Sequence, residues 1–173
     1  MNNKVISLLA VLAGFAGATT PGHSEILVAA TRTSAAIYGG ATYSVDFNGA
    51  AAGGTTYNFT TTEPNTRIVI MFNAEAACAG SPTQWTDIDI IVNPAGGAGD
   101  YVVPPSNGDN AFVSGNETDS DFLYAGGDGW VSAATIATMV VGPAGVHTVR
   151  VRVNGGSSGG ISRLDDMSLV VMK

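Results

Sequence analysis

Alternation of apolar and polar residues near the C-terminus is the feature that most restricts the fold of this chain. Residues 146–154 (VHTVRVRVN) place Val149, Val151 and Val153 on one side of an extended backbone and polar residues on the other. Side chains two positions apart share one face of a strand, so this segment predicts a half-buried β-strand. Residues 161–172 (ISRLDDMSLVVM) end with apolar residues on both faces, which is typical of a strand covered on both sides.

The rest of the chain repeats this pattern in short segments separated by turn residues. Residues 66–74 (TRIVIMFNA) have apolar side chains on both faces and are expected to form a central strand. Residues 130–141 (WVSAATIATMVV) are rich in alanine but alternate, which predicts a strand rather than a helix. Further strands are expected at residues 26–30, 41–48, 57–59, 85–93, 101–103 and 111–113. The sequence therefore predicts an all-β antiparallel β-sandwich of about eight to ten strands.

The N-terminus has the pattern of a secretory signal peptide. Lys4 supplies the positive charge, an apolar run follows to residue 18, and residues 16–18 (AGA) form a small-residue cleavage site. We therefore expect an exported protein, extracellular or periplasmic, with a flexible leader at residues 19–25 and a single β-sandwich domain at residues 26–173. A chain of this length buries about 70% of its unfolded surface without needing disulfides.

Charge and hydropathy argue against two classes of partner. The chain has 7 basic and 14 acidic residues, and removal of residues 1–18 takes away only Lys4, which changes the net charge from −7 to −8. No run of Lys or Arg could neutralise successive phosphates, so nucleic acid is not an expected partner. No later segment approaches the roughly 20 apolar residues of a transmembrane helix, so no membrane span is expected.

Cys78 is the single cysteine, and one cysteine cannot form an intramolecular disulfide. We expect it to be buried, because free cysteine is among the most buried residue types. A free reactive thiol and an intermolecular bridge are the alternatives.

The connection between the last two expected strands, residues 154–160 (NGGSSGG), allows two arrangements. A hairpin would place Arg150 near Asp165, whereas a crossing from one sheet to the other is the connection found in jelly rolls. In the last strand, Leu164 and Met167 are three residues apart, yet both are apolar and expected on the core side. This spacing predicts a β-bulge between them.

The C-terminal segment also carries a family resemblance. Residues 143–173 (PAGVHTVRVRVNGGSSGGISRLDDMSLVVMK) combine a small-residue turn, a valine-alternating strand, a Gly/Ser loop and a last strand. They resemble the end of bacterial secreted β-sandwich domains of the tumour-necrosis-factor-like jelly-roll kind, and residues 66–92 resemble the central strands. The resemblance implies a jelly roll that forms a homo-oligomer, most often a trimer, and acts in adhesion, surface coats or ligand binding rather than catalysis. The chain lacks the collagen-like stalk and the clear aromatic trimer seam of that picture.

Candidate catalytic groups are few, and no catalytic residue is predicted. His23 lies in the expected leader, and His147 begins a strand, where a histidine satisfied by a backbone carbonyl is the simpler interpretation. A glycosidase needs two carboxylates that flank the scissile bond. Such a pair could only be drawn from Glu63, Glu75, Asp87 and Asp89, and a glycosidase-like enzyme is our third hypothesis.

Residues 116–129 (NETDSDFLYAGGDG) form an acidic, glycine-rich segment. Its oxygen donors are Asn116, Glu117, Asp119, Asp121 and Asp128. Calcium takes roughly six to eight oxygen ligands from a pliable loop, but the spacing does not match an EF-hand. A solvated acidic loop is the first interpretation and a calcium site the alternative, and no other cofactor is expected.

Two tryptophans, Trp85 and Trp130, each begin an expected strand beside a loop. They could form a sugar-stacking platform, although a tryptophan at a strand end more often covers the core. Two hypotheses of different classes follow. The first is a non-catalytic structural or adhesive module that self-associates, and the second is a carbohydrate-binding module with calcium in the acidic loop. An extended apolar face would favour the first, and an exposed tryptophan over a polar cleft the second.

Overall fold

The computed structural model describes residues 24–39, 42–47, 54–79, 84–97, 99–106, 108, 111–115, 130–155 and 161–173. These residues contain eleven strands and no helix. The strands are β1 (Ile26–Arg32), β2 (Ala36–Gly39), β3 (Thr42–Ser44), β4 (Tyr57–Thr61), β5 (Thr66–Ala79), β6 (Gln84–Asn93), β7 (Tyr101–Val103), β8 (Ala111–Gly115), β9 (Val131–Val141), β10 (Gly145–Gly155) and β11 (Ile161–Met172). The described part of the chain thus offers no long apolar helix that could span a membrane.

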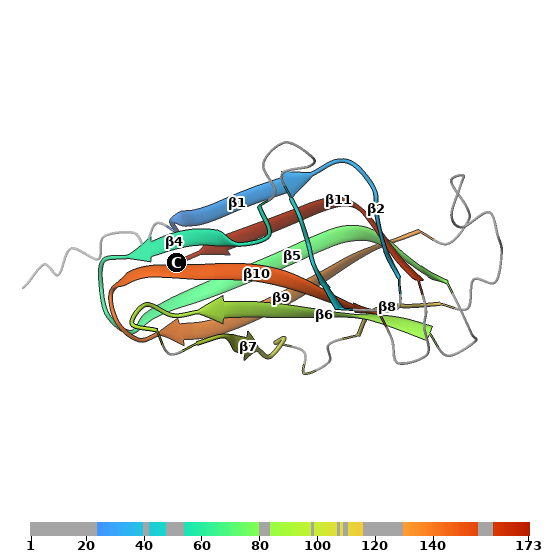
Figure 1. Ribbon diagram of the computed structural model, residues 1–173. Helices are drawn as coiled ribbons and strands as arrows, with labels where there is room; N and C mark the ends of the chain where they lie inside the picture. Colours follow the sequence, from blue (N-terminus) through green and yellow to red (C-terminus); the bar gives the residue numbers. More distant parts are fainter. Residues whose placement is uncertain are drawn as a thin grey trace, which may run out of the picture.

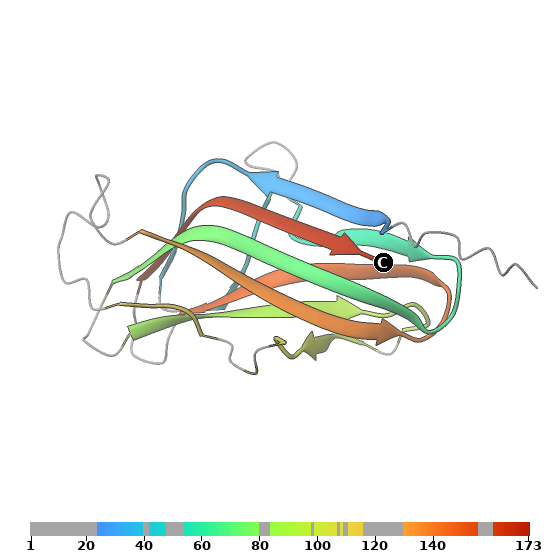
Figure 2. The ribbon, with the colours of Figure 1, turned by 180° about the vertical axis from the view of Figure 1, so that it is seen from behind.

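The strands form two antiparallel sheets that pack face to face. The five-stranded sheet has the order β1-β11-β5-β9, and β2 also pairs with β11. The six-stranded sheet has the order β3-β10-β6-β7, with β4 also on β10 and β8 also on β6. Figure 1 looks onto the six-stranded sheet, and Figure 2 looks from behind onto the five-stranded sheet.

The strand order is that of a jelly roll. β1 pairs with the last strand β11, β3 and β4 pair with β10, β5 pairs with β9, and β6 pairs with β7 and β8. Pairing from both ends of the chain inward describes one long hairpin wrapped around a sandwich, which is the jelly-roll arrangement. The predicted antiparallel β-sandwich is confirmed. The strand segments outnumber the expected eight to ten because β1 and β2, β3 and β4, and β7 and β8 each lie along a single partner strand.

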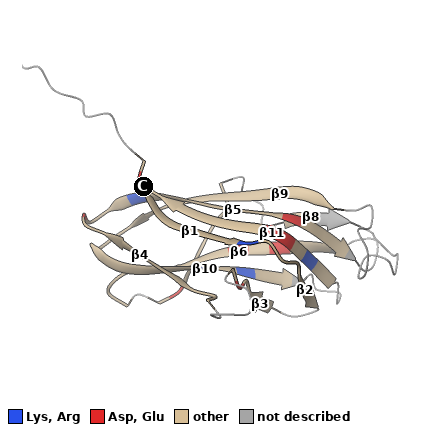
Figure 3. Ribbon diagram, turned by 90° about the horizontal axis from the view of Figure 1, so that it is seen from above, with Lys and Arg blue, Asp and Glu red and all other residues tan. Residues whose placement is uncertain are grey.

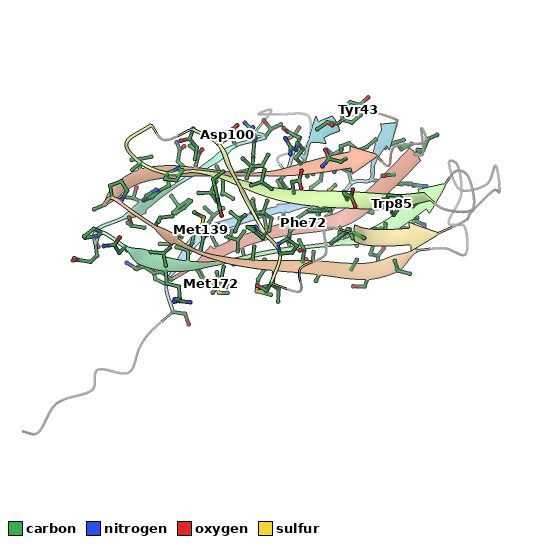
Figure 4. The ribbon with its side chains drawn as sticks, turned by 90° about the horizontal axis from the view of Figure 1, so that it is seen from below. Tyr43, Phe72, Trp85, Asp100, Met139 and Met172 are labelled. Carbon is green, nitrogen blue, oxygen red and sulfur yellow. The ribbon has the colours of Figure 1, made fainter. Side chains whose placement is uncertain are left out.

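The core lies between the sheets and follows the alternation of the sequence. Val149, Val151 and Val153 are fully buried, as the valine pattern predicts. Phe72 of β5 meets Phe47 edge to face, with 5.9 Å between the ring centroids, and Figure 4 shows Phe72 between the two sheets. Burial of each large apolar side chain contributes about 1.5–3 kcal/mol, so this layer supplies most of the favourable free energy of folding.

Two expected strands differ in length from the observed ones. The expected central strand at residues 66–74 is β5, which lies between β11 and β9 and continues to Ala79. The expected strand at residues 41–48 is regular only as β3. Val45 and Phe47 leave the strand yet remain buried, and the N–H of Val45 donates to the Val151 carbonyl at 2.9 Å.

Strand β11 contains the predicted bulge. Its register with β5 shifts between Asp165 and Ser168, and Asp166 has a positive φ of 44°. The extra residue brings Leu164 and Met167 to the same side, where both are almost completely buried. The bulge therefore keeps an uninterrupted core on both sides of a break in the alternation.

The connection between β10 and β11 crosses the sandwich. β10 belongs to the six-stranded sheet and β11 to the five-stranded sheet, so the hairpin alternative is wrong. Arg150 consequently pairs with Asp100 and not with Asp165. Alternation shows which face of a strand is buried but carries no information about which strand lies beside it, and this is why the sequence left both arrangements open.

The first and last described strands are tied together at one end of the molecule. The N–H of Glu25 donates to the Lys173 carbonyl at 2.9 Å, and the N–H of Lys173 donates to the Glu25 carbonyl at 3.0 Å. Their side chains form an ion pair of 2.8 Å. Residues 1–23, with the predicted signal peptide and most of the leader, lie outside the described residues.

Candidate functional site

The outward side of the five-stranded sheet forms an apolar surface, named here the apolar face. Residues opposite each other in register share a face, so Met71 of β5 lies between Val170 of β11 and Ile136 of β9. The face consists of Ala29, Val69, Met71, Ala134, Ile136, Val140, Val170 and Met172, and the exposed Thr138 lies among them, opposite Val69. Ile136 is 43% exposed and Val140 is 47% exposed. Apolar side chains from four neighbouring strands therefore meet water in one continuous patch.

Charged residues lie only toward the ends of the described part of this face. On β5, Arg67 stands at one end and Glu75 at the other, and Asp165 of β11 lies opposite Glu75. Strand β9 carries no charged residue along its length. Figure 3 shows the corresponding tan stretch of ribbon between coloured ends. The middle of the sheet is therefore without the strongly hydrated groups that normally keep a surface in water.

An open pocket of about 330 Å³ lies beside this face at the edge of β9. Its lining residues are Ser106, Ala134, Thr135 and Ile136. The N–H of Ser106 donates to the Ile136 carbonyl at 2.7 Å, and Pro105 bridges to Ala137. The segment after β7 thus covers part of the free edge of β9 and limits its pairing with another strand.

The outward side of the six-stranded sheet is named here the polar face, and an ionic network lies on it. Nε and Nη2 of Arg152 donate to Oδ2 of Asp89 at 3.0 and 2.5 Å. Nδ2 of Asn154 donates to the same oxygen at 2.6 Å. The outward direction of Asp89 is as predicted, but its side chain is largely shielded because β10 brings Arg152 alongside it. The shielded carboxylate fixes the positions of both donors.

Trp85 lies on the polar face at the start of β6. Its indole is 39% exposed, and it belongs to the same alternating row as Asp87 and Asp89. Four residues of strand place Trp85 about 13 Å from Asp89. Arg150 and Asp100 form a further ion pair, and Figure 4 shows Asp100 on this side of the sandwich. The face therefore combines one aromatic ring with fixed hydrogen-bonding groups.

Trp130 lies on the opposite side of the sandwich. The guanidinium carbon of Arg163 is 4.8 Å from the centroid of the Trp130 ring. Arg163 stands opposite Ala77 of β5, on the outward side of the five-stranded sheet. The structure therefore does not bring Trp85 and Trp130 together, and Arg163 occupies one face of the second indole. One ligand cannot stack on both rings.

His147 is completely buried between β4 and the turn after β6. Its Nδ1 accepts the backbone N–H of Ala95 at 2.9 Å, and its Nε2 lies 2.9 Å from Oγ1 of Thr61. The ring stacks on Phe59 with 5.0 Å between centroids. Burial lowers the pKa of His147, which favours the neutral ring. Both nitrogens are engaged, so neither is directed toward a substrate.

Cys78 is buried, as expected, near two buried hydroxyl groups. Oγ1 of Thr86 and Oγ of Ser162 lie 2.5 Å apart and join β6 to β11 across the core. Burial raises the pKa of the Cys78 thiol, and a hydrogen bond with Thr86 opposes that effect. The thiol is therefore held in its unreactive protonated form.

Of the acidic residues considered for catalysis, only Asp87 and Asp89 share one face of the molecule. Glu75 lies outward on the five-stranded sheet, whereas Asp87 and Asp89 lie outward on the six-stranded sheet, and Glu63 belongs to the β4–β5 turn. Residues 116–129, with all five candidate calcium ligands, lie outside the described residues. Within the described ranges, no group of three or more His, Cys, Asp or Glu side chains could hold a metal ion.

Sequence reasoning missed the apolar face, although part of its signal was present. Val69 and Met71 on β5 and Val170 and Met172 on β11 form a second apolar set that faces away from the core. Such double-sided strands indicate cover on both sides. What the sequence could not supply was the adjacency of β11, β5 and β9, which turns three separate sets into one surface.

Comparisons with known proteins identify no family for this chain. No protein-family model matches it, and no curated protein matches it significantly. It is similar to a chain in the structure of infectious bursal disease virus Gx strain, with a TM-score of 0.44, 11% identity, and coverage of 87% of this chain and 32% of that chain. It is also similar to the CBM22-1 xylan-binding domain of Paenibacillus barcinonensis Xyn10C, with a TM-score of 0.35, 13% identity, and coverage of 89% and 99%. This chain therefore spans about a third of the viral chain. The tumour-necrosis-factor-like resemblance stays a prediction.

Proposed function

We propose that the protein is an exported, non-catalytic structural module that self-associates through its apolar face. The observation that carries this proposal is the continuous row Val170, Met71 and Ile136 across three neighbouring strands, with exposed apolar side chains at its margin. Apolar area removed from water contributes about 25 cal/mol per Å². A second copy of the chain carries the same apolar face, so two copies can each cover the face of the other.

The sheet surface that carries the apolar face is large enough for a weak contact. Four strands about 4.8 Å apart, each about 27 Å long between the levels of Arg67 and Glu75, give a flat area of roughly 500 Å². This area includes the apolar face and the polar and charged residues around it. Two such sheet surfaces in contact would bury about 1,000 Å² in total, which is near the lower limit for a specific interface. The proposed assembly is therefore reversible and depends on concentration.

The test is the solution mass of the purified protein by light scattering across a range of concentrations. We expect a mass above that of the monomer, and Ile136→Glu should return the protein to monomers because a charge would enter the middle row of the apolar face. Val146→Glu is the matched control, since Val146 is 58% exposed on the polar face. A wild-type protein that stays monomeric at every concentration would contradict the proposal.

A carbohydrate-binding module is the second candidate, and the exposed Trp85 on the polar face is the observation that favours it. Aromatic faces stack on sugar rings, and the Arg152 and Asn154 side chains farther along the same face are held in place by Asp89. Trp85→Ala should abolish retention by soluble polysaccharides in affinity electrophoresis, whereas Trp130→Ala should leave it unchanged. Melting in calcium and again after chelation tests the calcium part of this hypothesis independently.

A further inference from the structure

The outward residues of β5 carry opposite charges at equal distances from their central residue. They are, in order, Arg67, Val69, Met71, Asn73 and Glu75. The positive and the negative charge stand four residues to either side of Met71, which is about 13 Å in each direction. Met71 lies in the middle row of the apolar face, so the charges mark opposite ends of one surface at equal distances from its centre.

Neither charge is neutralised within the described part of the chain. Arg67 and Glu75 are both exposed, and neither side chain forms an ion pair or hydrogen bond with another described residue. Their neighbours leave the two ends with opposite signs. Arg67 stands opposite the apolar Val140, whereas Glu75 stands opposite Asp165. Arg163, the next outward residue of β11 after Asp165, stands opposite Ala77 at the same end. The Arg67 end is therefore basic, and the Glu75 end carries two carboxylates and one guanidinium, a net negative charge.

When two copies pack by this face with their strands close to alignment, the two-fold axis that relates them runs either along the strands or across them. An axis along the strands would place Arg67 over Arg67 and Glu75 over Glu75 of the second copy. An axis across the strands through Met71 reverses the strand direction and places Arg67 over Glu75 of the second copy, twice. Like charges brought together across an interface disfavour it, so only the second arrangement is compatible with both charges.

We infer that the self-association is a two-fold, face-to-face dimer with antiparallel strand directions, in which Arg67 of each copy pairs with Glu75 of the other. This inference rests on the proposed function, because it specifies the geometry of the same face. Met71 lies on the axis and contacts its own counterpart. Asn73 of each copy lies over Val69 of the other.

The dimensions of stacked sheets permit this pairing. Packed sheets lie about 10 Å apart with strands about 30° from alignment, a gap that one arginine and one glutamate side chain bridge together. Exposed ion pairs add little affinity, so the two pairs select the orientation while apolar contact supplies the attraction. The resulting contact has two identical halves and closes with two copies.

Charge exchange tests the orientation. Arg67→Glu and Glu75→Arg should each raise the dimer dissociation constant, measured by sedimentation equilibrium at low salt, by about tenfold or more. The double variant R67E/E75R should return it to within about threefold of the wild-type value, because both opposite-charge pairs re-form. The double variant has the wild-type net charge, so a general effect of charge on association cannot produce this recovery.

The outcomes separate the orientation from the association itself. A monomeric wild type would overturn the proposed function and this inference with it. A dimer that the single variants do not weaken, or that the double variant does not restore, would overturn the orientation and leave self-association standing. A trimeric mass would overturn the two-fold axis.

If charge reversal prevents folding, the neutral double variant Arg67→Gln/Glu75→Gln tests the orientation instead. Neutralisation weakens the antiparallel dimer but strengthens a dimer with like charges in contact.

Discussion

The Nδ1 atom of His147 accepts the backbone N–H of Ala95 at 2.9 Å, in the interior of the sandwich. A ring nitrogen that accepts a hydrogen bond carries no proton, so the proton of the neutral ring is on Nε2, which faces Oγ1 of Thr61. The histidine thus joins the turn after β6 to strand β4. Protonation of Nδ1 would remove the bond to Ala95 and leave a buried cation.

We expect His147 to make stability fall in mild acid. Burial lowers its pKa below the ordinary value of about 6.5, so the unfolded state binds a proton that the folded state does not. The free energy of unfolding therefore declines as pH falls below about 6.5, until the folded pKa is reached. Between about pH 7 and pH 5, wild type should lose more stability than His147→Gln in urea unfolding. Parallel pH profiles of the two proteins would contradict this assignment.

The two ion pairs on the polar face should differ in strength. Asp89 is 6% exposed and accepts three hydrogen bonds, so Asp89→Asn should lower the free energy of unfolding by about 1–2 kcal/mol. Asp100→Asn removes the exposed pair with Arg150 and should cost less than about 0.5 kcal/mol. Chemical denaturation of both variants makes the comparison, and equal losses would show that burial of Asp89 is not what matters.

The bulge in β11 should tolerate glycine and reject valine. Asp166 has a φ of 44°, a region that β-branched residues rarely adopt, so Asp166→Val should lower the free energy of unfolding by about 1–2 kcal/mol. Asp166→Gly should stay within about 0.5 kcal/mol of wild type, because freedom at positive φ offsets the greater entropy of the unfolded chain. Thr60→Val on strand β4, which is exposed on the polar face opposite Val146, is the control for adding a valine. If Asp166→Val is as stable as that control, the bulge is not strained.

Cys78 should be protected from alkylation in the folded protein. Its thiol is buried, and burial raises its pKa, so little thiolate is available at pH 8. Iodoacetamide labelling followed by mass spectrometry should give unmodified protein under native conditions and complete modification in denaturant. Native labelling at the rate of a free cysteine would contradict the buried position.

The sequence predicted the faces of strands better than their neighbours. Val149, Val151 and Val153 had to be buried because alternation alone determines which side of a strand is apolar. The bulge between Leu164 and Met167 was equally local, since three residues of spacing cannot keep both on one side of a regular strand.

The candidate surfaces were not predictable in the same way. Arg152 and Asp89 are 63 residues apart in the chain, and only the β10–β6 register brings them into contact. The separation of Trp85 from Trp130 depends on which sheet each strand joins, and that choice is made by packing over the whole molecule. Pairing of distant strands is a global property, so local periodicity cannot determine it.

The reciprocal bonds between Glu25 and Lys173 also determine how the molecule would respond to a pulling force. A load applied through the two ends of the described chain acts first on these two hydrogen bonds and their ion pair. It then reaches the antiparallel β1–β11 ladder, whose hydrogen bonds lie parallel to the direction in which the two strands separate. These bonds therefore break one pair at a time, starting from the chain ends. A module held in series by its two ends would therefore extend at low force. One loaded through its sheet faces would have to slide whole strands past each other.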